Sequence, residues 1–140
     1  MKADRYKFRA WDGKKEVMLD VKEIEFYEKG RTWIRGTWFE SPTRQGDYRI
    51  QIAKPHILMQ STGLLDKNGV EIFEGDVVTC KMSFENKALP HMGEIVYMNQ
   101  FGAFATKNLA GETLLHNHML NTFKIIGNIW ANPELTKEQK

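Results

Sequence analysis

The sequence has a single cysteine, Cys80, among 140 residues. A lone cysteine excludes an intrachain disulfide and any zinc site built from several cysteines. Because Cys80 follows a β-branched run, it is predicted to be a small buried hydrophobic residue rather than a nucleophile. No apolar run approaches the roughly 18 residues that cross a bilayer, and the N-terminus lacks the apolar segment of a secretory signal. We therefore expect a cytoplasmic protein with no membrane contact.

The sequence also lacks the familiar signatures of catalysis. It has no P-loop, no Gly-x-Ser-x-Gly elbow, no dinucleotide-binding fingerprint and no His-Glu-x-x-His. We expect no enzyme, no catalytic residue and no cofactor. Two weaker patterns remain: a metal held by His116 and His118 with His91 or Glu112, and a carboxylate cluster of Glu71, Glu74 and Asp76. The plainer interpretations are that no metal is bound and that these carboxylates form a solvated rim.

Net charge is low, but it is unevenly distributed. The chain carries 20 basic and 18 acidic residues, for a net charge of +2. Residues 1–58 have 13 basic and 9 acidic residues, whereas residues 59–140 have 7 and 9. All six arginines lie in the first of these parts. If an anion is bound, we expect it there.

Short alternating segments separated by turn residues run along the whole chain. They recur roughly every ten residues, with no long amphipathic helix between them, which is typical of antiparallel β proteins. A polar stretch over residues 41–47 predicts an exposed loop. Residues 81–92 and 107–122 give no clear prediction. The segments predicted as strands or hairpins cover residues 5–11, 17–19, 23–39, 48–53, 70–78, 93–106 and 123–130.

The strongest local signal lies between residues 59 and 80. Asn68-Gly69 separates two apolar runs and predicts a tight hairpin connection with positive φ angles. Gly75 is expected to bend the following strand, and Gly127 to form a bulge in the last one. Pro133 then ends regular pairing.

These patterns predict a mostly β fold of antiparallel hairpins, with a small barrel-like or sandwich C-terminal part and an N-terminal β sheet packed on it. One domain over residues 1–132 is expected, divided into an N-terminal β part of about 1–57 and a C-terminal part of about 58–132. Residues 133–140 are expected to be a flexible tail.

An arginine and tryptophan grouping is the best functional signal in the sequence. On alternating strands its members share one face, where guanidinium groups could pair with phosphates and aromatic rings could stack on bases. The alternative is that the tryptophans lie in the core or in a subunit interface, with the arginines paired to Glu23, Glu25 and Glu28. The grouping consists of Arg5, Lys7, Arg9, Trp11, Arg31, Trp33 and Arg35.

Several motifs in order resemble the YopX family of phage and prophage proteins. They are KFRAWD at 7–12, LMQSTGL at 58–64, DKNG at 66–69, IFEGDVV at 72–78, IGNI at 126–129 and NPEL at 132–135. The resemblance implies coding in a bacteriophage or prophage and action in the bacterial cytoplasm. No family active site comes with it.

Our expectation is a non-enzymatic module that binds protein, either a host or phage protein, and associates with itself. Exposed edge strands and the aromatic content of residues 26–39 motivate this hypothesis. The alternative is a small β module that binds single-stranded nucleic acid.

Overall fold

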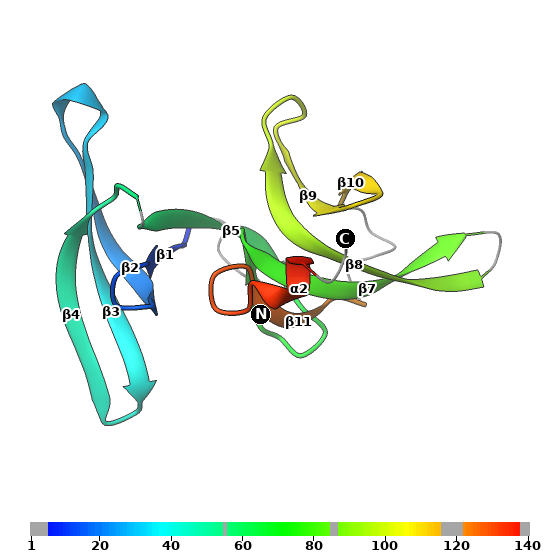
Figure 1. The fold of residues 1–140 in the computed structure, drawn as a ribbon, viewed down its shortest axis with the longest axis horizontal. Helices are drawn as coiled ribbons and strands as arrows, with labels where there is room; N and C mark the ends of the chain where they lie inside the picture. Colours follow the sequence, from blue (N-terminus) through cyan, green and yellow to red (C-terminus); the bar gives the residue numbers. More distant parts are fainter. Residues whose placement is uncertain (1–5, 55, 85–86, 116–121, 138–140) are drawn as a thin grey trace. The chain divides into compact units, whose positions relative to one another are not determined.

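The computed structural model describes residues 6–54, 56–84, 87–115 and 122–137. Almost all regular structure in these ranges is β, which confirms the predicted fold class (Figure 1). The elements are β1 Phe8–Asp12, β2 Val17–Phe26, the 3-10 turn η1 Glu28–Gly30, β3 Thr32–Ser41, β4 Arg44–Gln51, β5 Ile57–Leu65, β6 Glu71–Phe73, β7 Asp76–Phe84, β8 Lys87–Met98, β9 Ala103–Asn108, β10 Gly111–Leu114, β11 Lys124–Asn128 and α2 Glu134–Lys137.

The strands form two antiparallel sheets. The first has the order β4-β3-β2-β1-β5-β6 and the second the order β10-β9-β8-β7-β11. The second sheet is open, with β10 and β11 as its outer strands among the residues described, so no closed barrel forms there. The chain divides into an N-terminal unit of residues 7–60 and a C-terminal unit that comprises residues from Ser61 onward together with the first six.

In the N-terminal unit, β1 to β4 form a meander with tight connections. Pro42 and Thr43 make the turn between β3 and β4, so the predicted loop over 41–47 is wrong. Its polar residues are instead paired with β3, where Asp47 lies opposite Thr37. One sheet face carries the small buried core of Ala10, Leu19 and Ile34.

The C-terminal unit is built around the predicted turn at 66–69. Gly69 has φ of 79°, as predicted, but Asn68 is not among the described residues with positive φ. The buried carboxylate of Asp66 accepts hydrogen bonds from the backbone N–H of Asn68 (2.8 Å), Val70 (2.9 Å) and Ile125 (3.3 Å). The turn is thereby tied to β11, which is far away in sequence.

The two glycines predicted to redirect strands do so. Gly75 has φ of 84° between β6 and β7, and the register of β11 against β7 shifts between Ile125 and Gly127, which is a bulge. A Cβ on Gly127 would lie 2.5 Å from Oδ1 of Asn132, so only glycine fits there. Within the predicted tail, Glu134–Lys137 forms the helical turn α2.

Cys80 is buried, as predicted, in the core of the C-terminal unit. Burial raises the pKa of its thiol to about 11, so the reactive thiolate is scarce at neutral pH. Around it lie Ile72, Val78, Ile95 and Phe123.

Candidate functional site

The charged face of the N-terminal sheet is the face opposite its apolar core. Successive residues of a strand point to opposite faces, and the cross-strand register aligns the alternate residues of β1 to β4. The charged face therefore includes Arg9, Trp11, Met18, Asp20, Glu23, Glu25, Trp33, Arg35, Thr37, Phe39, Asp47, Arg49 and Gln51.

Arg35 is held between two carboxylates on the charged face. Its guanidinium lies 2.7 Å from Oδ2 of Asp47 and 3.2 Å from Oε1 of Glu23. The hydrogen bond and charge of Glu23, with those of Asp47, raise the pKa of Arg35. Asp47 also accepts a short hydrogen bond from the Thr37 hydroxyl. Arg35 is therefore already paired within its own sheet.

A second cluster on the charged face is centred on Arg49. Its Nε lies 3.2 Å from Oε1 of Glu25, and its guanidinium stacks over the Trp33 ring at 4.4 Å. The Tyr27 hydroxyl donates to Glu25 at 2.6 Å. The hydrogen bond between Tyr27 and Glu25 lowers the pKa of Glu25 and raises the pKa of Tyr27. The hydrogen bond from Arg49 lowers the pKa of Glu25 further. The Trp33 face under Arg49 is covered.

The structure places the predicted arginine and tryptophan grouping unevenly. Trp33 and Arg35 lie together in the charged face, and half-buried Arg9 and Trp11 lie on the same face in β1. Arg31 and Lys7 are exposed and lie outside the strands. Arg5 lies outside the described residues.

Arg49 and Asp47 were not predicted as members of this surface. The strand predicted from Tyr48 onward puts Arg49 and Gln51 on one face, which was the available signal. Their partners Glu25 and Arg35 come from other strands. The alternative in which Glu23 pairs with an arginine matches the observed pair with Arg35.

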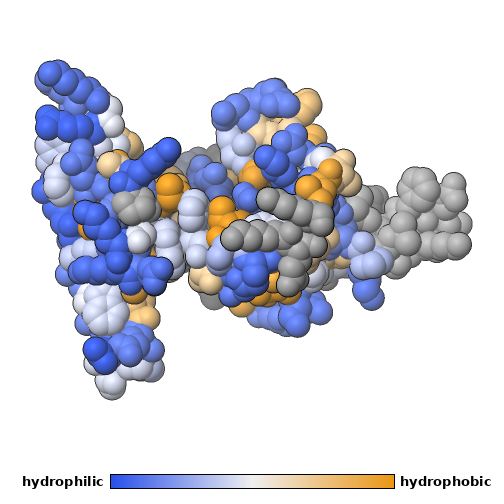
Figure 2. Space-filling model, viewed as in Figure 1, coloured by the Kyte–Doolittle hydropathy of each residue, from blue (hydrophilic) through white to orange (hydrophobic). Residues whose placement is uncertain are grey.

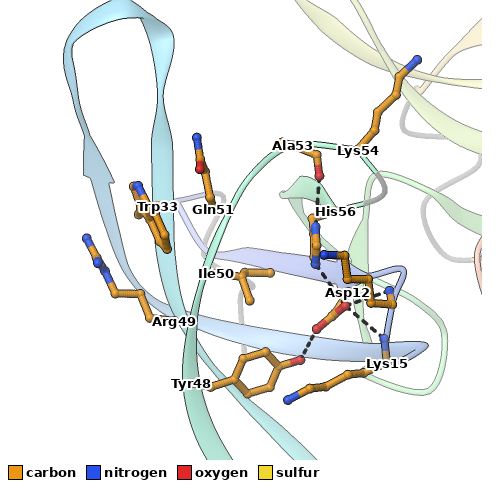
Figure 3. A pocket seen from close by; sticks show the side chains of 11 residues that line it. Asp12, Lys15, Trp33, Tyr48, Arg49, Ile50, Gln51, Ala53, Lys54 and His56 are labelled. Atoms are coloured by element: carbon orange, nitrogen blue, oxygen red, sulfur yellow. Dashed lines mark hydrogen bonds and ion pairs between the residues drawn. The ribbon is translucent and has the colours of Figure 1, made fainter.

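A groove of about 460 Å³ opens at one end of the N-terminal unit (Figure 3). It lies between the turn after β1, the end of β4 and the segment that leads to β5. We call it the lysine groove. It is lined by Asp12, Lys14, Lys15, Trp33, Tyr48, Arg49, Ile50, Gln51, Ala53, Lys54 and His56.

Asp12 is the polar centre of the lysine groove and is 2% exposed. Oδ2 accepts a hydrogen bond of 2.6 Å from the Tyr48 hydroxyl, and Oδ1 accepts from the backbone N–H of Lys14 (2.9 Å) and Lys15 (3.1 Å). Nε2 of His56 lies 3.1 Å from Oδ1. Burial raises the pKa of Asp12, but these hydrogen bonds and the His56 charge outweigh it and hold the pKa below its usual value.

Tyr48 and His56 are fixed by this carboxylate. Burial, followed by the hydrogen bond and charge of Asp12, raises the pKa of Tyr48, so its hydroxyl stays protonated and acts as a donor. Nδ1 of His56 faces the Ala53 carbonyl oxygen at 3.0 Å. The groove therefore presents lysine ammonium groups around a carboxylate whose partners are already in place.

The acidic and histidine patterns of the C-terminal unit do not assemble into a metal site among the described residues. His116 and His118 lie outside them. His91 is half-buried, with Nε2 2.9 Å from the Thr106 hydroxyl. The prediction of a solvated rim is wrong for Asp76, which is 2% exposed and accepts the Phe73 N–H at 2.9 Å.

Three comparisons with known proteins bear on this chain. The family described as YopX protein matches residues 7–137. The crystal structure of protein EF1440 from Enterococcus faecalis is similar, with 33% identity and a TM-score of 0.64, over 93% of this chain and 96% of that one. The SAWADEE domain of Arabidopsis thaliana SHH1 aligns over 86% and 96% with 16% identity and a TM-score of 0.29, too low to carry an argument. No curated protein matches.

Proposed function

The chain belongs to the YopX protein family, and from that premise we propose that it is a non-enzymatic protein-binding module that associates with itself in the bacterial cytoplasm. One observation carries the proposal: Arg35 and Arg49 on the charged face are paired within the sheet, while large aromatic side chains on β2 and β3 are exposed. Phe26 is 79% exposed and Phe39 is 58% exposed. Aromatic residues and arginine are enriched at protein interfaces.

A second copy of the chain fits this surface. β4 is the outermost strand of the first sheet, and such an edge can accept another strand. Antiparallel pairing of two β4 strands about Tyr48 would place Asp47 of each copy opposite Arg49 of the other. Such a two-fold contact is self-complementary in charge, as an isologous dimer interface requires.

Single-stranded nucleic acid is the less favoured partner for the charged face. Arg35 and Arg49 are already paired with carboxylates, and one side of Trp33 is covered by Arg49. A phosphate would have to displace these acidic partners. Protein contacts need no such displacement, because paired charges can lie at the polar rim of an interface.

Light scattering coupled to size-exclusion chromatography tests self-association. We expect a dimer at tens of micromolar, and a monomer for the double variant Phe26→Ser and Phe39→Ser. The matched control is Phe101→Ser, because Phe101 is also exposed, at 61%, but belongs to the C-terminal unit. A wild-type protein that stays monomeric would overturn self-association.

No helix within the described ranges is long and apolar enough to cross a membrane. Hydrophilic residues dominate the face of the N-terminal unit that Figure 2 shows. Affinity capture from bacterial lysate, with and without nuclease, distinguishes a protein partner from one bridged by nucleic acid. We expect capture to survive nuclease treatment.

A further inference from the structure

The lysine groove gathers positive charge that the rest of the unit does not neutralise. Lys14, Lys15 and Lys54 line it and are exposed. Within the part of the chain that the structure describes, none of their ammonium groups has a carboxylate within ion-pair distance. In this respect they differ from Arg35 and Arg49 on the charged face.

The one carboxylate in the lysine groove is already engaged. Asp12 receives the Tyr48 hydroxyl, two backbone N–H groups and His56. Nε2 of His56 faces Asp12 and Nδ1 faces the Ala53 carbonyl oxygen, so His56 is engaged inside the groove as well. Three lysines line the groove beside a single carboxylate, and they set its sign.

The other residues that line the lysine groove include apolar and aromatic side chains. Trp33, Ile50 and Ala53 contribute apolar surface, and the ammonium of Lys15 lies 3.9 Å from the centre of the Tyr48 ring. The volume of about 460 Å³ falls within the range of about 300–1,000 Å³ that is typical of small-ligand pockets. A ligand that fits needs a negative group for the lysines and a ring for the apolar walls.

We propose that the lysine groove binds a nucleoside phosphate, with the phosphate held by Lys14, Lys15 and Lys54 and the ring placed against Ile50 and Ala53. The phosphate and ring can belong to a free nucleotide or to one nucleotide of a single strand, because both present the same chemistry. The groove shares Tyr48 and Arg49 with the edge strand β4 that is proposed for self-association. The two proposals are distinguished by their tests, because nucleotide binding is measured by calorimetry and self-association by light scattering.

Isothermal titration calorimetry of the full chain at low salt tests the site with four probes: adenosine monophosphate, adenosine, inorganic phosphate and a single-stranded oligonucleotide of ten bases. We expect adenosine monophosphate to bind more tightly than adenosine, and binding to weaken as salt rises, since phosphate contacts are electrostatic. Equal affinity for the monophosphate and for the ten-base strand identifies a free nucleotide. An affinity that grows with strand length identifies nucleic acid.

Charge reversal locates the binding. The double variant Lys15→Glu and Lys54→Glu should weaken it by about tenfold or more, because charge-assisted hydrogen bonds to phosphate are lost. The control, Lys29→Glu with Lys124→Glu, changes the net charge equally at exposed lysines that do not line the groove. Three outcomes would overturn the proposal. Neither the monophosphate nor the strand binds, or adenosine binds as tightly as its monophosphate, or both double variants weaken binding equally.

Discussion

The N-terminal and C-terminal units are both antiparallel β structures, but they bury different kinds of side chain. The C-terminal core contains Phe123 at 0% exposure together with Ile72, Val78, Cys80 and Ile95. The buried residues of the N-terminal cluster are fewer and include no aromatic side chain: Ala10, Leu19 and Ile34.

The two units also differ in what their buried carboxylates bind. In the C-terminal unit, the buried carboxylate of Asp66 holds a turn and the last strand through backbone N–H groups. In the N-terminal unit, Asp12 binds the side chains of Tyr48 and His56, and both of these line a groove. The C-terminal unit uses a buried carboxylate to hold strands together, whereas the N-terminal unit places one beside a groove.

The largest effect that we expect comes from Phe123→Ala in the C-terminal core. It should lower the free energy of unfolding of this unit by about 3–5 kcal/mol, because apolar contacts are lost and a cavity remains. The rate of Cys80 labelling by a thiol reagent in urea measures it, since Cys80 lies in the same cluster. Phe101→Ala, at an exposed site, should change stability by less than about 0.5 kcal/mol. Similar losses in both variants would remove the distinction between core and surface.

A smaller loss is expected from Ile34→Ala in the N-terminal core, about 2–3 kcal/mol, near the lower end for such truncations. Its neighbours are half-buried and can close the space more readily. Tryptophan fluorescence in a Trp130→Phe background reports this unit, since Trp11, Trp33 and Trp38 all lie in it. Glu40→Ala is the control, at an exposed site on the same strand. A loss above that of Phe123→Ala would reverse the comparison between the two units.

Tyr48→Phe tests the polar centre of the lysine groove. Loss of its hydrogen bond to Asp12 should cost about 0.5–1.5 kcal/mol at neutral pH. The folded pKa of Asp12 lies below its usual value, so its stabilisation is present above the unfolded pKa and is lost as pH falls through the folded one. Without the Tyr48 donor the folded pKa rises, so in this variant the acid loss should begin near the same unfolded pKa, end at higher pH and be smaller in total. Urea unfolding from pH 7 to pH 2 measures both effects, and identical acid profiles would contradict them.

The smallest effect is expected from Arg35→Gln on the charged face. Its side chain and both partner carboxylates are largely exposed, and such pairs are weakened by solvent and salt. Thermal unfolding should show a slight fall in midpoint at low salt that disappears in concentrated salt. A large, salt-independent fall would mean that the charged face is a structural element of the unit.

Features that depend on a few neighbouring residues could be predicted from the sequence. Gly69, Gly75 and Gly127 were predicted at a turn, a bend and a bulge because positive φ or close packing at these points depends on neighbouring residues. The alternation that places Trp33 and Arg35 on one face was readable for the same reason. The prediction of a loop over residues 41–47 was wrong, because most of this polar stretch forms a strand that is stabilised by pairing with β3.

The lysine groove could not be predicted in this way. Asp12 and His56 were not predicted to meet, because neither carries a local signal of the other. Tyr48 and Asp12 lie 36 residues apart and meet only when β1 and β4 belong to the same sheet. Sequence spacing gives no measure of such a distance.

The sequence by itself determined the strand character, the turn positions and the uneven distribution of arginine, since each depends on a residue and its near neighbours. Tertiary structure alone decided which charges are paired and which stay open. Arg35 and Arg49 face carboxylates supplied by neighbouring strands, whereas Lys14, Lys15 and Lys54 meet around a carboxylate that is already engaged. The physical reason is that electrostatic pairing depends on distances in space, which strand order and register set.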